Sequence, residues 1–108
     1  MIAQREYLDS AGRCPFAQWR ESLDGRARTK VTVALRRLAE GNVSRVKSVG
    51  EGVSELKIDF GPGYRVYFGR YGVELVILLG GGTKKRQQSD IEQAQARWKD
   101  YKHRKHGT

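Results

Sequence analysis

The segment from residue 54 to residue 88 constrains the fold more than any other part of the chain. It reads SELKIDFGPGYRVYFGRYGVELVILLGGGTKKRQQ, and three of its runs alternate between apolar and polar residues, with glycine-containing turns between them. A period of two residues is typical of β-strands, and short glycine-rich connections are typical of antiparallel neighbours. We therefore expect a three-stranded meander. Its last strand, residues 73–79, is apolar at nearly every position, which favours a central strand covered on both faces.

The alternation assigns the side chains of the first two strands to opposite faces. One face is apolar and carries Leu56, Ile58, Phe60, Tyr64, Val66 and Phe68. The other face gathers Lys57, Arg65 and Tyr67, because residues two apart along a strand point the same way. We expect the apolar face to be core and the opposite face to be a polar surface. Arg65 would be held at a fixed position by its buried neighbours in the strand.

Patterns before the meander predict a strand and two helices. Residues 1–8 alternate weakly, which indicates a short strand at the edge or in the centre of the sheet. Pro15 suits the first position of a short helix that ends at 24–25, because its fixed φ favours a helix start. A second helix is expected from about 26 to 40, and we interpret its basic outer face as solvent-exposed. Residues 42–52 are polar and indicate a connection without regular structure.

Residues after the meander predict a third helix. Ser89 and Glu92 have the spacing of a capping box, in which each side chain binds the backbone N–H of the other residue. Residues 102–108 are basic and indicate a frayed tail. The elements together predict a single domain over 1–108 with an α+β fold. It comprises a small twisted, mainly antiparallel sheet, two N-terminal helices packed on one face, and a short C-terminal helix.

Composition narrows the classes of function. The 108 residues suit one domain with one modest core, and 21 Lys and Arg against 12 Asp and Glu give a net charge of +9. Such an excess favours an anionic partner, most often nucleic acid or an acidic protein. The single cysteine, Cys14, excludes an internal disulfide, and no apolar run approaches a membrane span of about 20 residues. We expect a cytoplasmic protein without a membrane interaction.

The chemistry that the residues offer is cationic. No paired carboxylates, nucleophile triad, Cys/His cluster or phosphate-binding loop is visible, and the two histidines of the tail lack partners at metal-ligand spacing. We therefore expect neither a metal nor a cofactor. Lys57 and Arg65, with Lys84 and Lys85 after the last strand, would converge on one phosphodiester. There an arginine stabilises developing charge, and a lysine among other cations serves as a base or an acid.

The same residues permit a purely structural interpretation. Lys57 and Arg65 would then be ordinary solvent-side strand residues that pair with Glu55, Asp59 and Glu74. The spacing alone does not decide between the two interpretations.

The chain resembles the RelE/ParE toxin superfamily. The order of a strand, two helices, a meander containing GPGYRVYF, and a strand ending in LLGGGTKKRQQSDIEQAQ is most similar to the HigB-like, phage-derived Gp49-like branch of addiction module killer proteins. The resemblance implies a toxin of a type II toxin–antitoxin pair. RelE-like members cleave mRNA in the ribosomal A site, without a metal, through attack of a 2′-OH. ParE-like members poison DNA gyrase. A non-catalytic basic module that binds nucleic acid is the alternative from another class.

The resemblance also assigns residues to roles. It implies that Arg65 is the phosphate-binding arginine, that Lys57 is the basic residue one strand earlier, and that Lys84 and Lys85 are the lysine pair after the last core strand. It also places Gln88 at the family's glutamine, as a substrate-binding residue. From the residues themselves we expect Tyr67 to stack on a base or orient a phosphate, and Arg86 to join the lysines in binding the substrate. Two features depart from the family pattern. Gly82-Thr83 replaces the usual aromatic before the lysine pair, and the tyrosine that RelE carries near its C-terminus has no counterpart, because Tyr101 lies within a helical packing stripe.

The resemblance further implies partners. A cognate antitoxin, often of the helix-turn-helix type, would neutralise the chain and repress the operon, so operator DNA would be reached only through the antitoxin. The substrate would be mRNA on the ribosome.

Overall fold

The protein is a mixed α+β domain in a computed structural model that describes residues 1–73 and 75–106. In chain order its elements are β1 (Ala3–Glu6), α1 (Pro15–Glu21), α2 (Gly25–Ala39), β2 (Val46–Ser48), β3 (Val53–Ile58), β4 (Tyr64–Tyr71), β5 (Leu75–Thr83), a short 3₁₀ helix η1 (Lys84–Arg86) and α3 (Gln87–His106). Sheet, N-terminal helices and C-terminal helix all agree with the expected fold class. None of the helices within the described residues is both long enough and apolar enough to cross a lipid bilayer.

The five strands form one sheet in the order β1-β5-β4-β3-β2. The predicted meander is confirmed as β3, β4 and β5, which pair in antiparallel fashion, and β1 lies at the far edge, parallel to β5. The segment 42–52 was expected to lack regular structure, and this is wrong for Val46–Ser48. These residues form strand β2 because Val46 packs against the core and pairs with Leu56.

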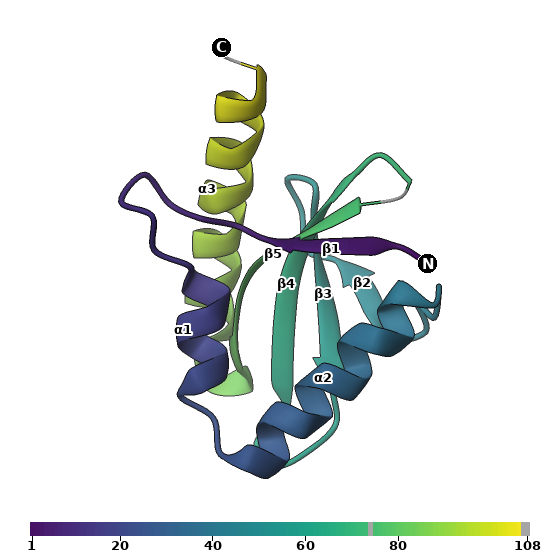
Figure 1. The fold of residues 1–108 in the computed structure, drawn as a ribbon. Coiled ribbons are helices and arrows are strands. Elements are labelled where there is room, and N and C mark those ends of the chain that lie inside the picture. Colours follow the sequence, from purple (N-terminus) through teal and green to yellow (C-terminus); the bar gives the residue numbers. More distant parts are fainter. Residues whose placement is uncertain (74, 107–108) are drawn as a thin grey trace.

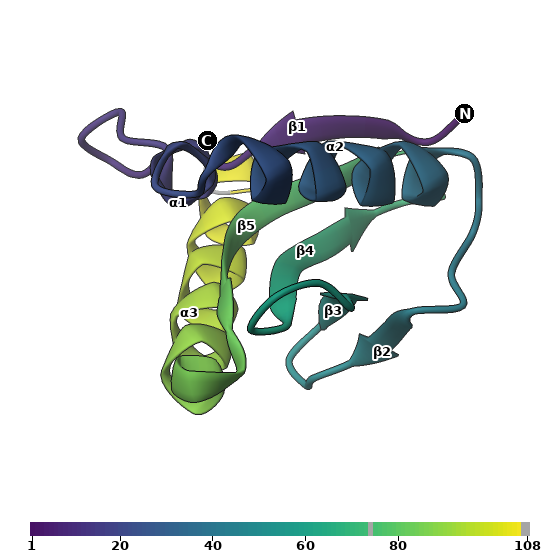
Figure 2. The ribbon, with the colours of Figure 1, turned by 90° about the horizontal axis from the view of Figure 1, so that it is seen from below.

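Helices cover both faces of the sheet (Figures 1 and 2). On one face α1 and α2 enclose a core that includes Val31, Leu38, Val66 and Phe68. On the other face α3 lies against β5, β4 and β3 and encloses a second core, made of Tyr7, Val53, Tyr67, Ile77, Leu79, Ala94 and Trp98. The expectation that this second face is an open polar surface is therefore wrong, because α3 is long enough to bury much of it.

Strand β5 continues through the glycine run instead of ending before it. The pairing of β4 with β5 shifts between Tyr67 and Phe68, so that Leu79 is the extra residue of a β-bulge. A side chain at Gly81 would collide with the ring of Trp19, and one at Gly82 would collide with the carboxylate of Asp90. The glycines thus let α1 and α3 approach the backbone of β5, which fixes the first turns of α3 over the sheet.

Helix α3 starts earlier and extends further than the sequence indicated. It follows η1 directly and begins at Gln87, so the predicted capping box at Ser89 is wrong, and the Ser89 hydroxyl accepts a hydrogen bond from the side chain of Gln93 instead. Residues 102–106, expected to be frayed, belong to the helix. Residues 107–108 of that tail lie outside the described residues. The helix is held near its end by Asp100, which accepts a 2.6 Å hydrogen bond from the hydroxyl of Tyr7.

Candidate functional site

Three adjacent strands bring the predicted cations to one end of the sheet. Lys57 of β3 is the register partner of Arg65 in β4, and Arg65 is the partner of Gly82 in β5. Directly opposed residues of antiparallel strands point to the same face, so Lys57 and Arg65 lie on the face that carries α3. The chain leaves β5 at Thr83 and enters η1, which places Lys84–Arg86 at the same end of the sheet.

Arg65 is buried, with only 7% of its side chain exposed. Its Nη1 donates a 3.1 Å hydrogen bond to the carbonyl oxygen of Gly63, and its Nε lies 3.6 Å from Oε1 of Glu55. The Nε has no hydrogen-bond partner among the residues that the structure describes. The guanidinium is thus fixed by the sheet, as expected, but it is not on the open surface that the alternation indicated.

Glu55 is the most deeply buried charged residue of this end of the sheet, with 2% of its side chain exposed. Besides Arg65, its carboxylate has Nζ of Lys47 at 3.8 Å and accepts a 2.9 Å hydrogen bond from Nε2 of Gln87. Gln87 is the first residue of α3, so this bond ties the start of the helix to β3. Sequence reasoning named Glu55 only as a surface partner of Arg65. The sequence signal that could have identified Glu55 is its position two residues before Lys57, which places both side chains on the same face of the strand.

Tyr67 lies beside this pair, beneath α3. It is 1% exposed, and its hydroxyl has no hydrogen-bond partner among the described residues. Burial raises the pKa of the phenol well above its ordinary value, and the negative charge of Glu55, its register partner, raises it further. Its predicted location on an open face is wrong, and in this structure the ring does not offer a face on which a base could stack.

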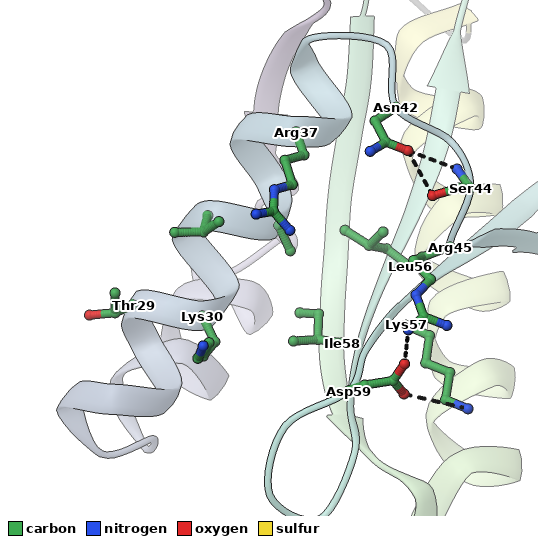
Figure 3. Close-up of a pocket in the computed structure, with 12 residues that line it drawn as sticks. Thr29, Lys30, Arg37, Asn42, Ser44, Arg45, Leu56, Lys57, Ile58 and Asp59 are labelled. Carbon is green, nitrogen blue, oxygen red and sulfur yellow. Dashed lines mark hydrogen bonds and ion pairs between the residues drawn. The ribbon is translucent and has the colours of Figure 1, made fainter.

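The exposed cations lie at the same end of the sheet as the buried pair. Lys57 is 48% exposed, and its Nζ lies 3.7 Å from Oδ1 of Asp59 (Figure 3). Lys84, Lys85 and Arg86 are all exposed in η1. Neither Lys84 nor Lys85 forms an ion pair within the part of the chain that the structure describes.

The remaining predicted residues have local partners. Gln88 is exposed, and its side-chain amide donates a 3.3 Å hydrogen bond to Glu92, one turn further along α3. The ion pairs of the structural interpretation are confirmed for Lys57 with Asp59 and for Arg65 with Glu55. Its third partner, Glu74, lies outside the described residues. Within residues 1–73 and 75–106, no group of three or more His, Cys, Asp or Glu side chains is placed to hold a metal ion.

This arrangement suits the binding and activation of an anion. Glu55 already holds the planar guanidinium of Arg65 in place. The side chain therefore loses little further conformational entropy when it binds an anion. The exposed lysines at this end of the sheet add positive charge and protons that can be transferred.

A family model matches this chain over residues 18–99, under the description "Phage derived protein Gp49-like (DUF891)". The chain belongs to the Gp49-like family. This family is toxin-like, of the addiction module killer type. The matched segment includes every residue of the candidate site. An uncharacterized protein of Haemophilus influenzae is 46% identical to this Gp49-like protein over 80 residues, which cover 73% of this chain and 81% of that protein.

Proposed function

We propose that this Gp49-like protein is the toxin of a type II toxin–antitoxin system and that it cleaves mRNA on the ribosome, as HigB-like members of the RelE/ParE superfamily do. The observation that carries the proposal is the buried Glu55–Arg65 pair, with the exposed Lys57, Lys84 and Lys85 at the same end of the sheet. The protein would act in the cytoplasm, where translating ribosomes are found.

The proposed reaction needs no metal. A lysine at the rim removes the proton of a ribose 2′-OH, and the resulting oxygen attacks the adjacent phosphorus. The bond from phosphorus to the 5′-oxygen breaks, a second cation donates a proton to that oxygen, and the products are a cyclic 2′,3′-phosphate and a free 5′-OH. Arg65 stabilises the charge that develops on the phosphate oxygens. Lys57, Lys84 and Lys85 are the candidates for the proton transfers.

The other residues of the site have supporting roles in this proposal. Glu55 holds the guanidinium of Arg65 in place, and Gln87 holds Glu55. Because its ring is buried, Tyr67 acts through its hydroxyl, whose hydrogen-bonding capacity no described residue uses. Arg86 and Gln88 are exposed next to the lysines and bind the substrate.

The proposal is tested by inducing the chain alone in cells and mapping the 5′ ends of transcripts. We expect growth to stop and new 5′ ends to appear inside codons. The Lys84→Ala/Lys85→Ala variant should lose most of the effect, whereas Lys99→Ala, an exposed control on α3, should retain it. Growth arrest with intact transcripts refutes the nuclease function, and DNA damage in its place selects gyrase as the target. Salt-dependent nucleic-acid binding without arrest or cleavage identifies a non-catalytic binding module.

The proposal includes a protein partner. The net charge of +9 would steer an antitoxin with acidic segments to this chain. We expect the antitoxin to be encoded beside the toxin gene, to be of the helix-turn-helix type, and to carry the contact with operator DNA. Co-expression of the two genes should give a complex that survives purification, and a chain that purifies alone from such cells contradicts this part of the proposal.

A further inference from the structure

A groove separates the middle of α2 from the outer part of β3 (Figure 3). Its volume is about 390 Å³, and its apolar floor consists of Val33, Ala34, Leu56 and Ile58. Leu56 and Ile58 are buried core residues that also line the groove, near the edge of the sheet where β2 pairs with Ser54–Leu56. The groove therefore opens a path from solvent to the apolar layer between helix and sheet.

The rim of the groove is cationic. Lys30 and Arg37 stand on α2, and Arg45 and Lys57 stand on the opposite side, with Asp59 as the acidic residue among the lining side chains. Asp59 is shared, because both Arg45 and Lys57 form ion pairs with it. Lys30 and Arg37 form no ion pair with any residue that the structure describes. The ammonium of Lys30 lies 5.3 Å from the centroid of the Phe60 ring. The groove thus combines apolar surface with positive charge on Lys30 and Arg37 that no carboxylate of the described residues neutralises.

These properties fit a peptide better than a nucleic acid. A nucleic acid would be expected to meet aromatic rings on which its bases stack, and the lining of the groove contains none. An amphipathic segment places its apolar side chains in such a groove and its charged side chains on the rim. Since the unpaired rim charges are positive, the complementary segment is acidic.

The groove also adjoins the candidate site. Lys57 lines the groove at its outer edge, and it is the register partner of Arg65 on β4. The groove lies on the α2 side of the sheet and the Glu55–Arg65 pair on the α3 side, so a segment bound in the groove would meet the site only through Lys57 of β3.

We propose that the α2–β3 groove binds an acidic amphipathic segment of the antitoxin. Apolar side chains of the segment cover Leu56 and Ile58, and its carboxylates pair with Lys30 and Arg37. The inference rests on the proposed function in taking the partner to be an antitoxin. The contact with Lys57 gives the segment a route to suppress activity without entering the space above Arg65.

Two pairs of charge reversals on one helix test the groove. The groove variant is Lys30→Glu/Arg37→Glu. The control variant is Arg28→Glu/Arg36→Glu, which changes the net charge of the same helix equally but lies on a different face of it. The probe is the purified protein encoded by the gene adjacent to that of this chain, and its affinity is measured by calorimetry after circular dichroism has shown that both variants are folded. We expect the groove variant to bind at least about 100-fold more weakly and the control to change less than about 5-fold.

A third variant tests the apolar floor without changing charge. Ala34→Met places a larger side chain in the groove and should weaken binding about 10-fold or more. Equal losses in the two charge variants, unchanged binding by the groove variant, or no binding by the wild-type chain each overturn the proposal. Toxicity is scored separately. A wild-type chain that does not stop growth refutes the toxin function, whereas the comparison of affinities still decides where the partner binds.

Discussion

Removing the side chain of Arg65 should destabilise the protein mainly by leaving Glu55 without its closest buried cation. Both side chains are more than nine-tenths buried, and Nε of Arg65 lies 3.6 Å from Oε1 of Glu55. Breaking a buried ion pair by removing one member typically costs about 3–5 kcal/mol, because the other charge stays buried. Gln87 and Lys47 continue to hold the carboxylate, so we expect Arg65→Ala to lower the free energy of unfolding by about 3 kcal/mol.

A second substitution separates this cause from simple loss of packing. Glu55→Gln removes the charge that Arg65→Ala leaves behind, so the double variant should be more stable than Arg65→Ala alone by about 1–2 kcal/mol. The assay is urea unfolding followed by circular dichroism. With a slope of about 1–3 kcal/mol per M, the single variant should unfold at a midpoint lower by at least about 1 M.

An exposed pair provides the control for this experiment. Lys57 and Asp59 are each about half exposed, so Lys57→Ala should change the free energy of unfolding by less than about 1 kcal/mol. If Arg65→Ala is no more destabilising than Lys57→Ala, or if the double variant is no more stable than Arg65→Ala, then Glu55 does not hold Arg65 and the reasoning on the site fails. Only the first of these results, an Arg65→Ala variant as stable as Lys57→Ala, would allow toxicity assays on Arg65→Ala to be interpreted without regard to folding.

Two further predictions follow from Tyr67 and from the glycines of the sheet. The pKa of the Tyr67 phenol is raised above its ordinary value of 10.0, so the native state keeps a proton that the unfolded chain releases, and stability should fall as pH rises above about 10. Urea midpoints measured between pH 8 and 11 should fall less steeply in Tyr67→Phe, although Tyr7, whose pKa burial also raises, keeps part of the slope. Gly69→Ala should lower the thermal midpoint strongly, because its Cβ would overlap the ring of Trp98. Gly25→Ala at the start of α2 has room for a Cβ and should leave the midpoint unchanged or raise it, and the reverse order of the two midpoints would contradict the packing described for α3.

The sequence predicted those parts of the fold whose signals are local. The two-residue period of 54–79 located β3, β4 and β5, and the apolar stripe of 26–40 located α2. Both patterns depend only on residues within the same strand or helix. The fold class follows from these elements and their order. β2 was missed because three residues carry too little periodicity to stand out from a polar loop.

The sequence predicted which residues come together in the candidate site, but not how deeply they are buried. Register brings Lys57 and Arg65 together as expected, since strand pairing follows from the meander. The burial of Arg65 and Tyr67 depends on where α3 lies, and nothing in the alternation of β3 and β4 indicates that a helix beginning at Gln87 covers them. The glycines at 80–82 were expected to follow the last strand, which was predicted to end at residue 79. Instead, the absence of side chains at Gly81 and Gly82 lets Trp19 and Asp90 approach strand β5. The sequence did not indicate this, because Trp19 and Asp90 belong to other elements of the chain.

The most direct test of the proposed activity is cleavage of a defined mRNA in a reconstituted translation reaction, with the purified chain added to ribosomes that are stalled with an empty A site. We expect a single cut within the A-site codon, with a 5′-OH on the downstream fragment, and no cut when ribosomes are absent. Adding a metal chelator that leaves the ribosomes intact should not change the rate. The Lys57→Ala and Lys84→Ala/Lys85→Ala variants should cut at least about 100-fold more slowly. An mRNA that remains whole beside wild-type protein, or one that all the variants cut at the wild-type rate, would contradict the assignment of this end of the sheet as a ribonuclease site.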